Sequence, residues 1–446
     1  MYFIIHIKNK LAFLSLAFII LSSTSMSVTI NNNQVFAQQQ QEFRQEEFTD
    51  NGGDPDLIDP NLEVETVVEG LELPTSMAFV GPDHILVLEK DKGTVREIIN
   101  GELIEEPLLD VSVASYVERC MCGIAVSKTG SVTNVFLYYT EMEGSLDGGD
   151  RNGGTQEPLG NRLYKYELVN HKLVNPVLLL DLPANPGPRH NGGAITIGPD
   201  NNIYVPIGDV DGTYKGDETD TLVQNNEDGG EPDGRGGILR VTQDGETVHK
   251  TILGDESPLN LYYAYGIRNS FGIDFDPVTG YLWDTENGAG NSDEINLVLP
   301  GFNSGWQPIM GMSQEPDPDD ELETFDGKGK YSNPELVWVG TVGPTAVKFL
   351  NSDKLGAQYK NDMFVGDVHN GFLYRFDLNS QRTELVLPSA FANKIIPSDD
   401  ALEDSSIVFG DDFGGITDLE VSPYDGYLYA VSISHGKIFK IVPTQG

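Results

Sequence analysis

The chain has 446 residues and a formal net charge of −41, from 28 Lys and Arg against 69 Asp and Glu. A field of that sign repels phosphate backbones and anionic membrane surfaces, so it argues against nucleic-acid binding. It suits a protein that binds hard cations such as Ca²⁺, although the same charge can serve solubility alone. The 49 Gly and 25 Pro, together with 18 Tyr and 20 Phe, predict many short strands joined by turns.

The N-terminus has the pattern of an export signal. Lys8 and Lys10 precede an apolar run over residues 11–21, which is too short to span a membrane comfortably. A small-residue cleavage pattern (VFA) ends at Ala37. We therefore expect residues 1–37 to be a signal peptide that is cleaved, which would leave a secreted or extracytoplasmic protein without a membrane span. The alternative is an uncleaved N-terminal anchor.

Residues 38–61 are polar and acidic and contain Gly and Pro. Such a segment has too little apolar surface to fold by itself, so it predicts a flexible linker. The linker leads into a domain that we place at residues 62–446.

From Val64 onward the chain repeats one unit six times. A unit opens with a short β-rich run, turns, and closes with a second run that usually ends in a hydrophobic–basic–hydrophobic triplet. Successive openings lie between 50 and 82 residues apart, which leaves room for a four-stranded blade of about 40–45 residues and a long loop. The openings are 85–88, 135–139, 203–205, 281–283, 363–365 and 427–429, and the closings are 93–98, 161–168, 236–241, 293–298, 371–378 and 436–442.

These repeats predict an all-β fold, a six-bladed β-propeller with four-stranded blades. Turn signals such as residues 198–201 (GPDN) precede the opening strands, and no segment has a sustained apolar period of 3.6 residues. In such a ring the loops at one end of the central channel form the pocket. The longest insertions follow Asp209 and Trp306, so we expect the functional site near them.

Both cysteines stand in the short segment Cys120-Met121-Cys122. A disulfide between positions i and i+2 of a strand is strained, so we expect two buried free thiols. The alternative interpretation is capture of a soft metal such as Cu(I).

His190 is the first candidate for chemistry. It stands in residues 188–193 (PRHNGG), where paired glycines allow a tight backbone that is open to a ligand. An imidazole suits general-base work near neutral pH. Asp209 follows 19 residues later and can accept a hydrogen bond from the ring. The alternative is a surface-loop His and an unrelated turn Asp.

Two further segments are rich in polar groups. Arg268 and Asn269 stand between glycines and offer donors that suit an oxyanion or a quinone oxygen, although such an Arg can also hold loops together through carbonyls. Residues 285–294 (TENGAGNSDE) offer oxygen ligands for Ca²⁺ without the spacing of an EF-hand. We interpret the acidic residues 315–326 as a solvated loop.

Taken in order, the segments between Leu71 and Val442 resemble the glucose/sorbosone dehydrogenase family. The resemblance is carried chiefly by ERCMCGIAVS (118–127), HNGGAITIGPDNNIYVPIGD (190–209), YGIRNSFGIDFDPVTG (265–280) and GAGNSDEINLVLPGFNSGW (288–306). It implies a six-bladed propeller that acts as an exported sugar dehydrogenase and uses pyrroloquinoline quinone (PQQ) and Ca²⁺.

The resemblance also implies roles for single residues. His190 would be the base that takes the proton of the sugar's anomeric hydroxyl while hydride passes from C1 to the quinone, and Asp209 would be its partner. Arg268 and Asn269 would contact the reactive edge of the quinone. The backbone carbonyls of Gly288 and Ala289 would bind the Ca²⁺ that polarises the quinone, and the acids Asp293 and Glu294 would lie beside this ion.

The chain departs from the family pattern where the cofactor's carboxylates are expected. Residues 415–418 (GITD) stand where the family has an R-I-R-D motif, so that Gly415 and Thr417 replace its two cofactor-binding arginines. His369 replaces a cofactor-binding lysine, and Glu118 replaces a glutamine. PQQ carries three carboxylates, so the loss of two guanidinium partners weakens its binding unless Arg189 and His369 compensate.

The sequence therefore predicts a PQQ- and calcium-dependent aldose dehydrogenase that acts on a small sugar and passes electrons to an external acceptor. The alternative is a calcium-binding propeller without PQQ. Such a protein would be a lactonase-type hydrolase or a noncatalytic module that binds a carbohydrate or a partner.

Overall fold

The computed structural model describes residues 53–144, 147–151, 156–210, 220–315, 318–398, 401–402 and 406–444. The predicted signal peptide and residues 38–52 of the predicted linker lie outside this part of the chain. The described residues form strands and turns, which confirms the predicted all-β class. None of their helices is long and apolar enough to cross a membrane. These helices are short 3-10 segments: η3 (Leu222–Gln224), η4 (Leu259–Leu261), η5 (Pro318–Asp320), η6 (Ala357–Tyr359) and η7 (Ser389–Phe391).

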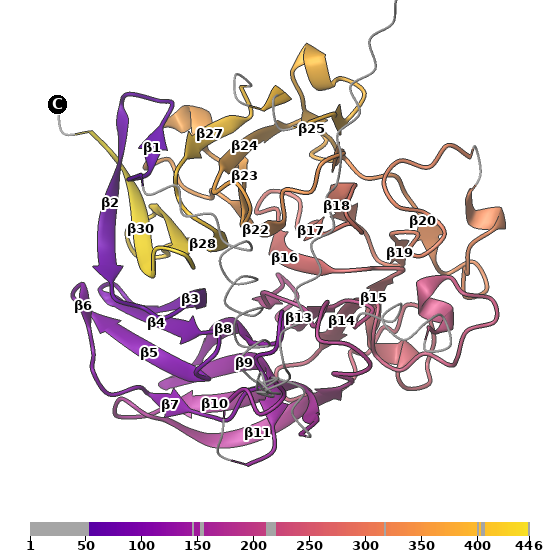
Figure 1. Ribbon diagram of the computed structural model, residues 1–446, viewed down its shortest axis with the longest axis horizontal. Coiled ribbons are helices and arrows are strands. Elements are labelled where there is room, and N and C mark those ends of the chain that lie inside the picture. Colours follow the sequence, from indigo (N-terminus) through magenta and orange to yellow (C-terminus); the bar gives the residue numbers. More distant parts are fainter. Residues whose placement is uncertain are drawn as a thin grey trace, which may run out of the picture.

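The described strands pair into six sheets in a propeller-like arrangement (Figure 1). The first sheet contains β3 (Pro74–Gly81), β4 (His84–Glu89), β5 (Thr94–Ile99), β6 (Glu102–Leu103) and β7 (Leu109–Asp110). The second contains β8 (Met121–Thr129), β9 (Val132–Met142), β10 (Pro158–Leu168) and β11 (Leu173–Leu182). The third contains β12 (Thr196–Ile197), β13 (Ile203–Ile207), β14 (Gly237–Val241), β15 (Tyr262–Tyr265), β19 (Phe302–Asn303) and β20 (Lys330–Tyr331).

The other three sheets complete the ring. The fourth contains β16 (Ser270–Phe275), β17 (Leu282–Glu286), β18 (Asp293–Val298), β21 (Leu336–Trp338) and β26 (Ile395–Ile396). The fifth contains β22 (Pro344–Phe349), β23 (Met363–Asp367), β24 (Leu373–Leu378), β25 (Leu385–Val386), β27 (Val408–Asp411) and β1 (Asp56–Leu57). The sixth contains β28 (Ile416–Val421), β29 (Leu428–Ser432), β30 (Lys437–Pro443) and β2 (Leu62–Glu69).

Neighbouring sheets contact one another through their innermost strands. The contacts run from β3 to β8, β8 to β12, β13 to β16, β16 to β22, β22 to β28, and from β28 back to β3. Because this series returns to the first sheet, the sheets close around a central channel, and the inner edges of the innermost strands face that channel instead of open solvent.

The predicted repeat is confirmed strand by strand. Each opening run pairs antiparallel with its own closing run, in the pairs β4–β5, β9–β10, β13–β14, β17–β18, β23–β24 and β29–β30. The second and sixth sheets contain four strands each, the number predicted for one repeat unit. The other sheets gain short strands such as β6 and β25, because their long connections lie along the sheet edges and pair with them.

The sixth sheet joins the two ends of the domain. β2 pairs antiparallel with β30, from Leu62 opposite Pro443 to Glu69 opposite Lys437. β2 lies at the start of the predicted domain, and its pairing with the last strand holds the ring closed.

The end of the predicted linker is a correction. Asp56 and Leu57 form β1 and pair with Asp411 and Gly410 of β27. The Ile58 N–H also donates to the Phe409 carbonyl at 3.1 Å, and Leu57 packs on the apolar core beside the fifth and sixth sheets. Ordered structure therefore begins before residue 62, since these few residues can add to an exposed sheet edge.

The two cysteines are a second correction. Cys120 and Cys122 form a disulfide with their Cα atoms 5.1 Å apart, and both residues are buried. The β8–β9 pairing shifts register between Met121 and Gly123. This irregularity accompanies a Cα separation well inside the range of a disulfide and shorter than the roughly 6.6 Å between positions i and i+2 of a regular strand. The predicted free thiols, and with them Cu(I) capture, are therefore wrong for this structure.

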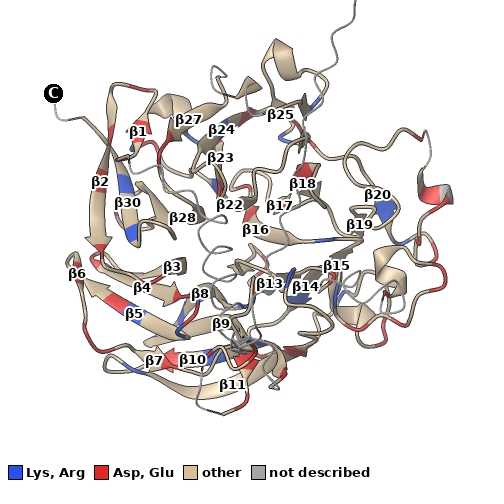
Figure 2. Cartoon of the chain, in the orientation of Figure 1, with Lys and Arg blue, Asp and Glu red and all other residues tan. Residues whose placement is uncertain are grey.

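Apolar side chains fill the spaces between sheets. One cluster packs Trp283, Trp338 and Tyr374 between the fourth and fifth sheets, with the Trp338 and Tyr374 rings 5.5 Å apart. Complete burial of such a side chain stabilises the fold by about 1.5–3 kcal/mol. Acidic residues lie outside this cluster, on strands β2 and β5 and in the loops beside β20 (Figure 2).

The two ends of the channel differ. At one end of the channel lie the first residues of the innermost strands. At the other end, toward the last residues of β16, β22 and β28, Asp274, Lys348 and Glu420 line a cavity of about 330 Å³. The Lys348 ammonium lies 3.0 Å from Glu420 and 3.5 Å from Asp274. The Asp418 carboxylate beside them accepts hydrogen bonds from Ser76 and from the Met77 N–H.

Candidate active site

A cavity of about 290 Å³ lies at the first end of the channel. Thr75, Phe271, Thr345 and Thr417 line it, and each is the second residue of an innermost strand. Loops between strands provide the rest of the wall. Eight of the predicted site residues line this cavity: Glu118, His190, Arg268, Asn269, Gly288, Asp293, His369 and Thr417.

His190 and Asp209 form a buried pair. His190 is 3 % exposed and Asp209 is 0 % exposed, and their Nδ1 and Oδ1 atoms lie 2.5 Å apart. A carboxylate only accepts, so Nδ1 carries the hydrogen and Nε2 is the nitrogen that can accept a proton from a ligand. The predicted contact between these two residues is confirmed, and the interpretation as a surface-loop His is wrong.

Close backbone approach explains the glycines around this pair. His190 has a positive φ of 60°, and Gly192 has a φ of 95°. A Cβ at Gly192 would clash with the Pro206 carbonyl, and one at Gly208 would clash with the Arg268 carbonyl and with His190 itself. These positions therefore require glycine because β13 and the His190 loop lie against each other.

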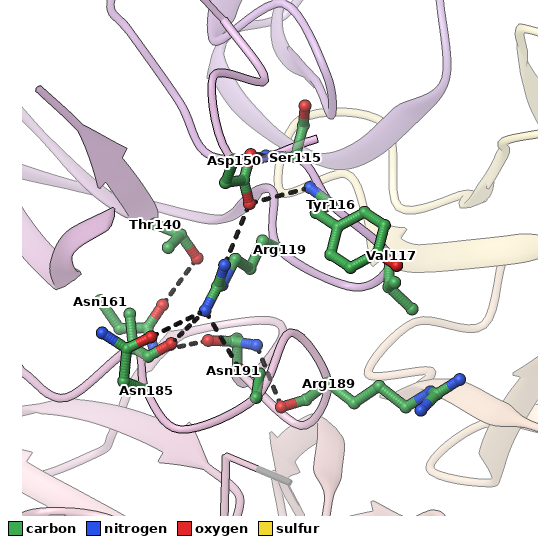
Figure 3. Close-up of polar contacts among 12 residues, drawn as sticks. Ser115, Tyr116, Val117, Arg119, Thr140, Asp150, Asn161, Asn185, Arg189 and Asn191 are labelled. Atoms are coloured by element: carbon green, nitrogen blue, oxygen red, sulfur yellow. Dashed lines mark hydrogen bonds and ion pairs between the residues drawn. The ribbon is translucent and has the colours of Figure 1, made fainter. Parts of the chain in front are cut away.

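A polar network behind the cavity fixes the His190 loop (Figure 3). The buried Arg119 guanidinium donates to Asp150 at 3.1 Å and to the Ala184 carbonyl at 2.6 Å. Asn161 donates to Asn191 at 2.9 Å, next to His190 in the chain. The network joins the second sheet to this loop, so the loop is held from both sides.

Glu118 connects the His190 loop with Asn269. Its Oε2 accepts the His190 backbone N–H at 2.7 Å and the Asn269 amide at 3.4 Å. A carboxylate is therefore used here to hold backbone, although it also lines the cavity.

Arg268 makes contacts on three sides. Its Nη1 donates to the carbonyls of Asn287 and Gly288, both at 2.7 Å. Its backbone N–H donates to Glu286 at 2.6 Å, and its guanidinium lies 5.6 Å from the centre of the Trp306 ring. Arg268 therefore does hold a loop through its carbonyls, as the alternative interpretation proposed, and it also lines the cavity.

The predicted calcium segment is arranged around backbone donors. Asp293 accepts the N–H groups of Gly288, Val342 and Gly343 at 2.7–2.8 Å. Burial raises the pKa of Asp293 despite these donors. Glu294 accepts from the Gly311 N–H at 2.7 Å and does not line the cavity.

The carbonyls of this segment fit a cation better than its acids do. Within the described ranges, no group of three His, Cys, Asp or Glu side chains could hold a metal ion. The Asn287 and Gly288 carbonyls, however, converge on one cationic nitrogen, and carbonyl oxygens are ligands that Ca²⁺ accepts. Ala289 is exposed and lies outside the cavity wall.

On the side of the cavity where the sequence departs from the family pattern, polar side chains contact backbone carbonyls. The Thr417 hydroxyl donates to the Pro74 carbonyl at 3.0 Å and is buried. His369 Nδ1 lies 3.1 Å from the Thr341 carbonyl. Lys90 also lines the cavity, and its ammonium donates to the Val117 carbonyl at 2.8 Å.

Two residues that serve the site, Trp306 and Glu286, were given no role of their own in the sequence analysis. Trp306 Nε1 donates to Asp209 Oδ2 at 2.9 Å, so the carboxylate is held at both oxygens. Glu286 is buried beneath Arg268, and burial raises its pKa to about 7. Trp306 precedes a long insertion and could have been suspected, whereas the burial of Glu286 has no local sequence signal.

Comparison with known proteins agrees with this geometry. The family model described as glucose/sorbosone dehydrogenase matches residues 71–440. The aldose sugar dehydrogenase YliI of Escherichia coli is 23% identical over 390 residues, which cover 86% of this chain and 93% of that protein. An uncharacterized protein of Synechocystis, slr1608, is 27% identical over 326 residues, which cover 72% of this chain and 77% of that protein.

Solved structures show the same fold. A putative oxidoreductase (glucose dehydrogenase) of Thermus thermophilus superposes with a TM-score of 0.63 at 25% identity, over 85% of this chain and 100% of that one. The PQQ-bound aldose sugar dehydrogenase of Streptomyces coelicolor superposes with a TM-score of 0.61 at 21% identity, over 87% and 99%. Because the family model matches well over half of its length, the chain belongs to the glucose/sorbosone dehydrogenase family.

Proposed function

We propose that this protein oxidises an aldose at C1, with His190 as the general base. The observation that carries the proposal is the buried His190–Asp209 pair, which faces a cavity of about 290 Å³. Membership of a family of sugar dehydrogenases supports the same reaction class.

The chain's own residues act in this reaction as follows. The anomeric hydroxyl of the sugar would give its proton to His190 Nε2, and a hydride acceptor bound in the cavity would take the hydride of C1, so that the sugar would become a lactone. Asp209 holds the ring in the tautomer with Nε2 unprotonated and stabilises the imidazolium that forms. Burial of both residues strengthens their interaction, since little water competes for it.

PQQ is the cofactor that we propose, with Ca²⁺ beside it. When bound, the quinone would accept the hydride and the cation would polarise it. Arg268 and Asn269 offer donors in the same cavity as His190, and Gly288 offers a carbonyl ligand. Arg189 and Lys90 add positive charge to the wall and His369 adds an imidazole, and these groups would hold carboxylates of the cofactor.

Reconstitution tests the proposal directly. The purified protein is titrated with PQQ in the presence of Ca²⁺ or EDTA, and aldose-dependent reduction of an external dye is followed. We expect calcium-dependent binding and turnover. Absence of PQQ binding at micromolar concentration would remove the dehydrogenase assignment.

One observation favours a second function. The Thr417 hydroxyl is committed to the Pro74 carbonyl, and the Gly288 carbonyl accepts from Arg268. A propeller of this kind could bind a carbohydrate or hydrolyse a lactone without PQQ. Sugar binding or lactone hydrolysis by protein that contains no PQQ would identify that function.

Three finer proposals accompany the main one. We propose that each of the six sheets is one blade, which makes the fold a six-bladed propeller. We also propose that residues 1–37 direct export, so that electrons pass to an acceptor outside the cytoplasm. N-terminal sequencing of the protein recovered from its native compartment tests export, with a mature start after Ala37 as the expected result.

A further inference from the structure

We propose that Trp306 is a positioning residue of this site, which holds the Asp209 carboxylate and through it sets the tautomer of His190. The inference rests on the proposed role of His190 as the base. It assigns a function to a side chain that does not itself line the cavity.

The first observation is a continuous series of contacts. The Trp306 indole N–H donates to Asp209 Oδ2 at 2.9 Å, while Asp209 Oδ1 lies 2.5 Å from His190 Nδ1. Asp209 is completely buried, so its orientation depends on donors from the protein. The indole therefore fixes the rotation of the carboxylate that His190 needs.

The second observation is that the indole also contacts Arg268. The guanidinium lies 5.6 Å from the centre of the indole ring, within the range of a cation–π contact. The Asp209 N–H donates to the Arg268 carbonyl at 2.9 Å. The Trp306 side chain thus contacts both Asp209, the partner of the proposed base, and the Arg268 guanidinium, which lines the cavity.

The third observation is how firmly Trp306 itself is held. Its backbone N–H donates to the Gly266 carbonyl at 2.9 Å, and its carbonyl accepts from the Asn225 amide at 2.8 Å. Asn225 in turn exchanges hydrogen bonds with Asn303 at 2.8 and 3.0 Å. Hydrogen bonds of Asn225 therefore join the end of η3 to β19 and to the segment that follows it, and this segment holds the indole rigidly.

The other tryptophans provide an internal comparison. The chain has three, and the indole nitrogens of Trp283 and Trp338 are buried without a hydrogen-bond partner among the described residues. Only Trp306, of the three, has its indole hydrogen bond recorded in the described structure. Packing explains the first two, whereas the third places a donor on a buried carboxylate.

The test uses Trp306→Phe, which keeps a ring and removes the N–H. The control is Trp283→Phe, which makes a similar change in a core position away from the cavity. The ¹⁵N spectrum of the His190 ring reports its tautomer in protein without cofactor. His190→Gln assigns the His190 signals among those of the seven histidines.

We expect the Nδ1–H tautomer to dominate in the wild type and in Trp283→Phe, and to become mixed in Trp306→Phe. In reconstituted enzyme we expect kcat to fall about tenfold in Trp306→Phe, with KM changed less than about twofold, since the base is misplaced and the sugar contacts remain. An unchanged tautomer together with an unchanged kcat would overturn the inference.

A measurement on the wild type keeps the test valid if Trp306→Phe does not fold. The indole N–H signal of Trp306 should exchange more slowly with solvent than an exposed indole, and should shift when Asp209→Asn alters its acceptor. An indole signal indifferent to Asp209→Asn would also overturn the inference. Failure of the proposed function has a different signature, because the wild type would then lack PQQ-dependent turnover while the tautomer still responded to Trp306→Phe.

Discussion

The two sides of the cavity differ in what their polar groups hold. On the His190 side, functional side chains hold one another, from Trp306 through Asp209 to the imidazole. On the Thr417 side, the polar groups are bonded to backbone carbonyls, as Thr417 is to Pro74 and His369 is to Thr341. Under the proposed function, the first arrangement would prepare a base for proton transfer, whereas the second builds a wall. The groups that would carry proton transfer are therefore held by one another, and those that would meet an anionic cofactor are held by backbone.

The largest effect is expected for His190→Ala. Loss of the general base should lower kcat about 10³-fold, while PQQ binding measured by fluorescence is retained. His171→Ala is the matched control, because its side chain is 68 % exposed on another surface. Retained turnover in His190→Ala would show that the base lies elsewhere.

Asp209→Asn should have the next largest effect. The amide can present N–H to Nδ1 and favour the wrong tautomer, so we expect kcat to fall roughly 100-fold with little change in KM. Equal falls in Asp209→Asn and in Glu118→Gln would contradict the comparison, since Glu118 holds backbone and not the ring.

Thr417→Arg acts on the other side. A guanidinium returned to this position should tighten PQQ binding about tenfold, because it gives a carboxylate of the cofactor a charged donor. Thr417→Met has similar bulk without charge, and its Kd should not improve. A Kd that is unchanged by the arginine would mean that the anion lies elsewhere in the cavity.

The smallest effect is expected at the far end of the channel. Burial raises the pKa of Asp418 to about 7, with a further contribution from Glu420. A carboxyl whose pKa is raised in the folded protein stabilises it below the unfolded pKa of about 4, and that stability is lost as the pH rises through about 7. Asp418→Asn should therefore remove on the order of 1 kcal/mol of this pH dependence, measured by urea unfolding at about pH 5 and about pH 8. Turnover should be unchanged, since Asp418 does not line the cavity that contains His190.

The opening and closing strands of each repeat could be predicted from the sequence, whereas the short strands in the connections between them could not. Alternating apolar residues and turn signals marked β4, β5 and the other opening and closing strands. Short strands such as β19 and β26 pair with distant partners, and their few residues carry no period of their own. β1 was assigned to a linker because its composition is polar, although pairing with β27 needs only its backbone.

The site divides in the same way. His190 and Asp209 were found because they lie only 19 residues apart and their residue types suit one reaction. The acids at 293 and 294 were expected beside a metal, yet their oxygens accept N–H groups from Val342 and Gly311, which are distant in sequence. The donor on Asp209 was missed for the same reason, since Trp306 reaches it across 97 residues.

The pairing of β2 with β30 has a consequence for how the molecule is made. The strand that completes the sixth sheet ends at Pro443, so this sheet cannot form until the residues up to Pro443 have left the ribosome. Until then β2 and β29 lack the strand that lies between them, so β2 is unpaired in this sheet. A nonsense mutation at the start of β30 would therefore leave the first and last parts of the domain unjoined through the sixth sheet.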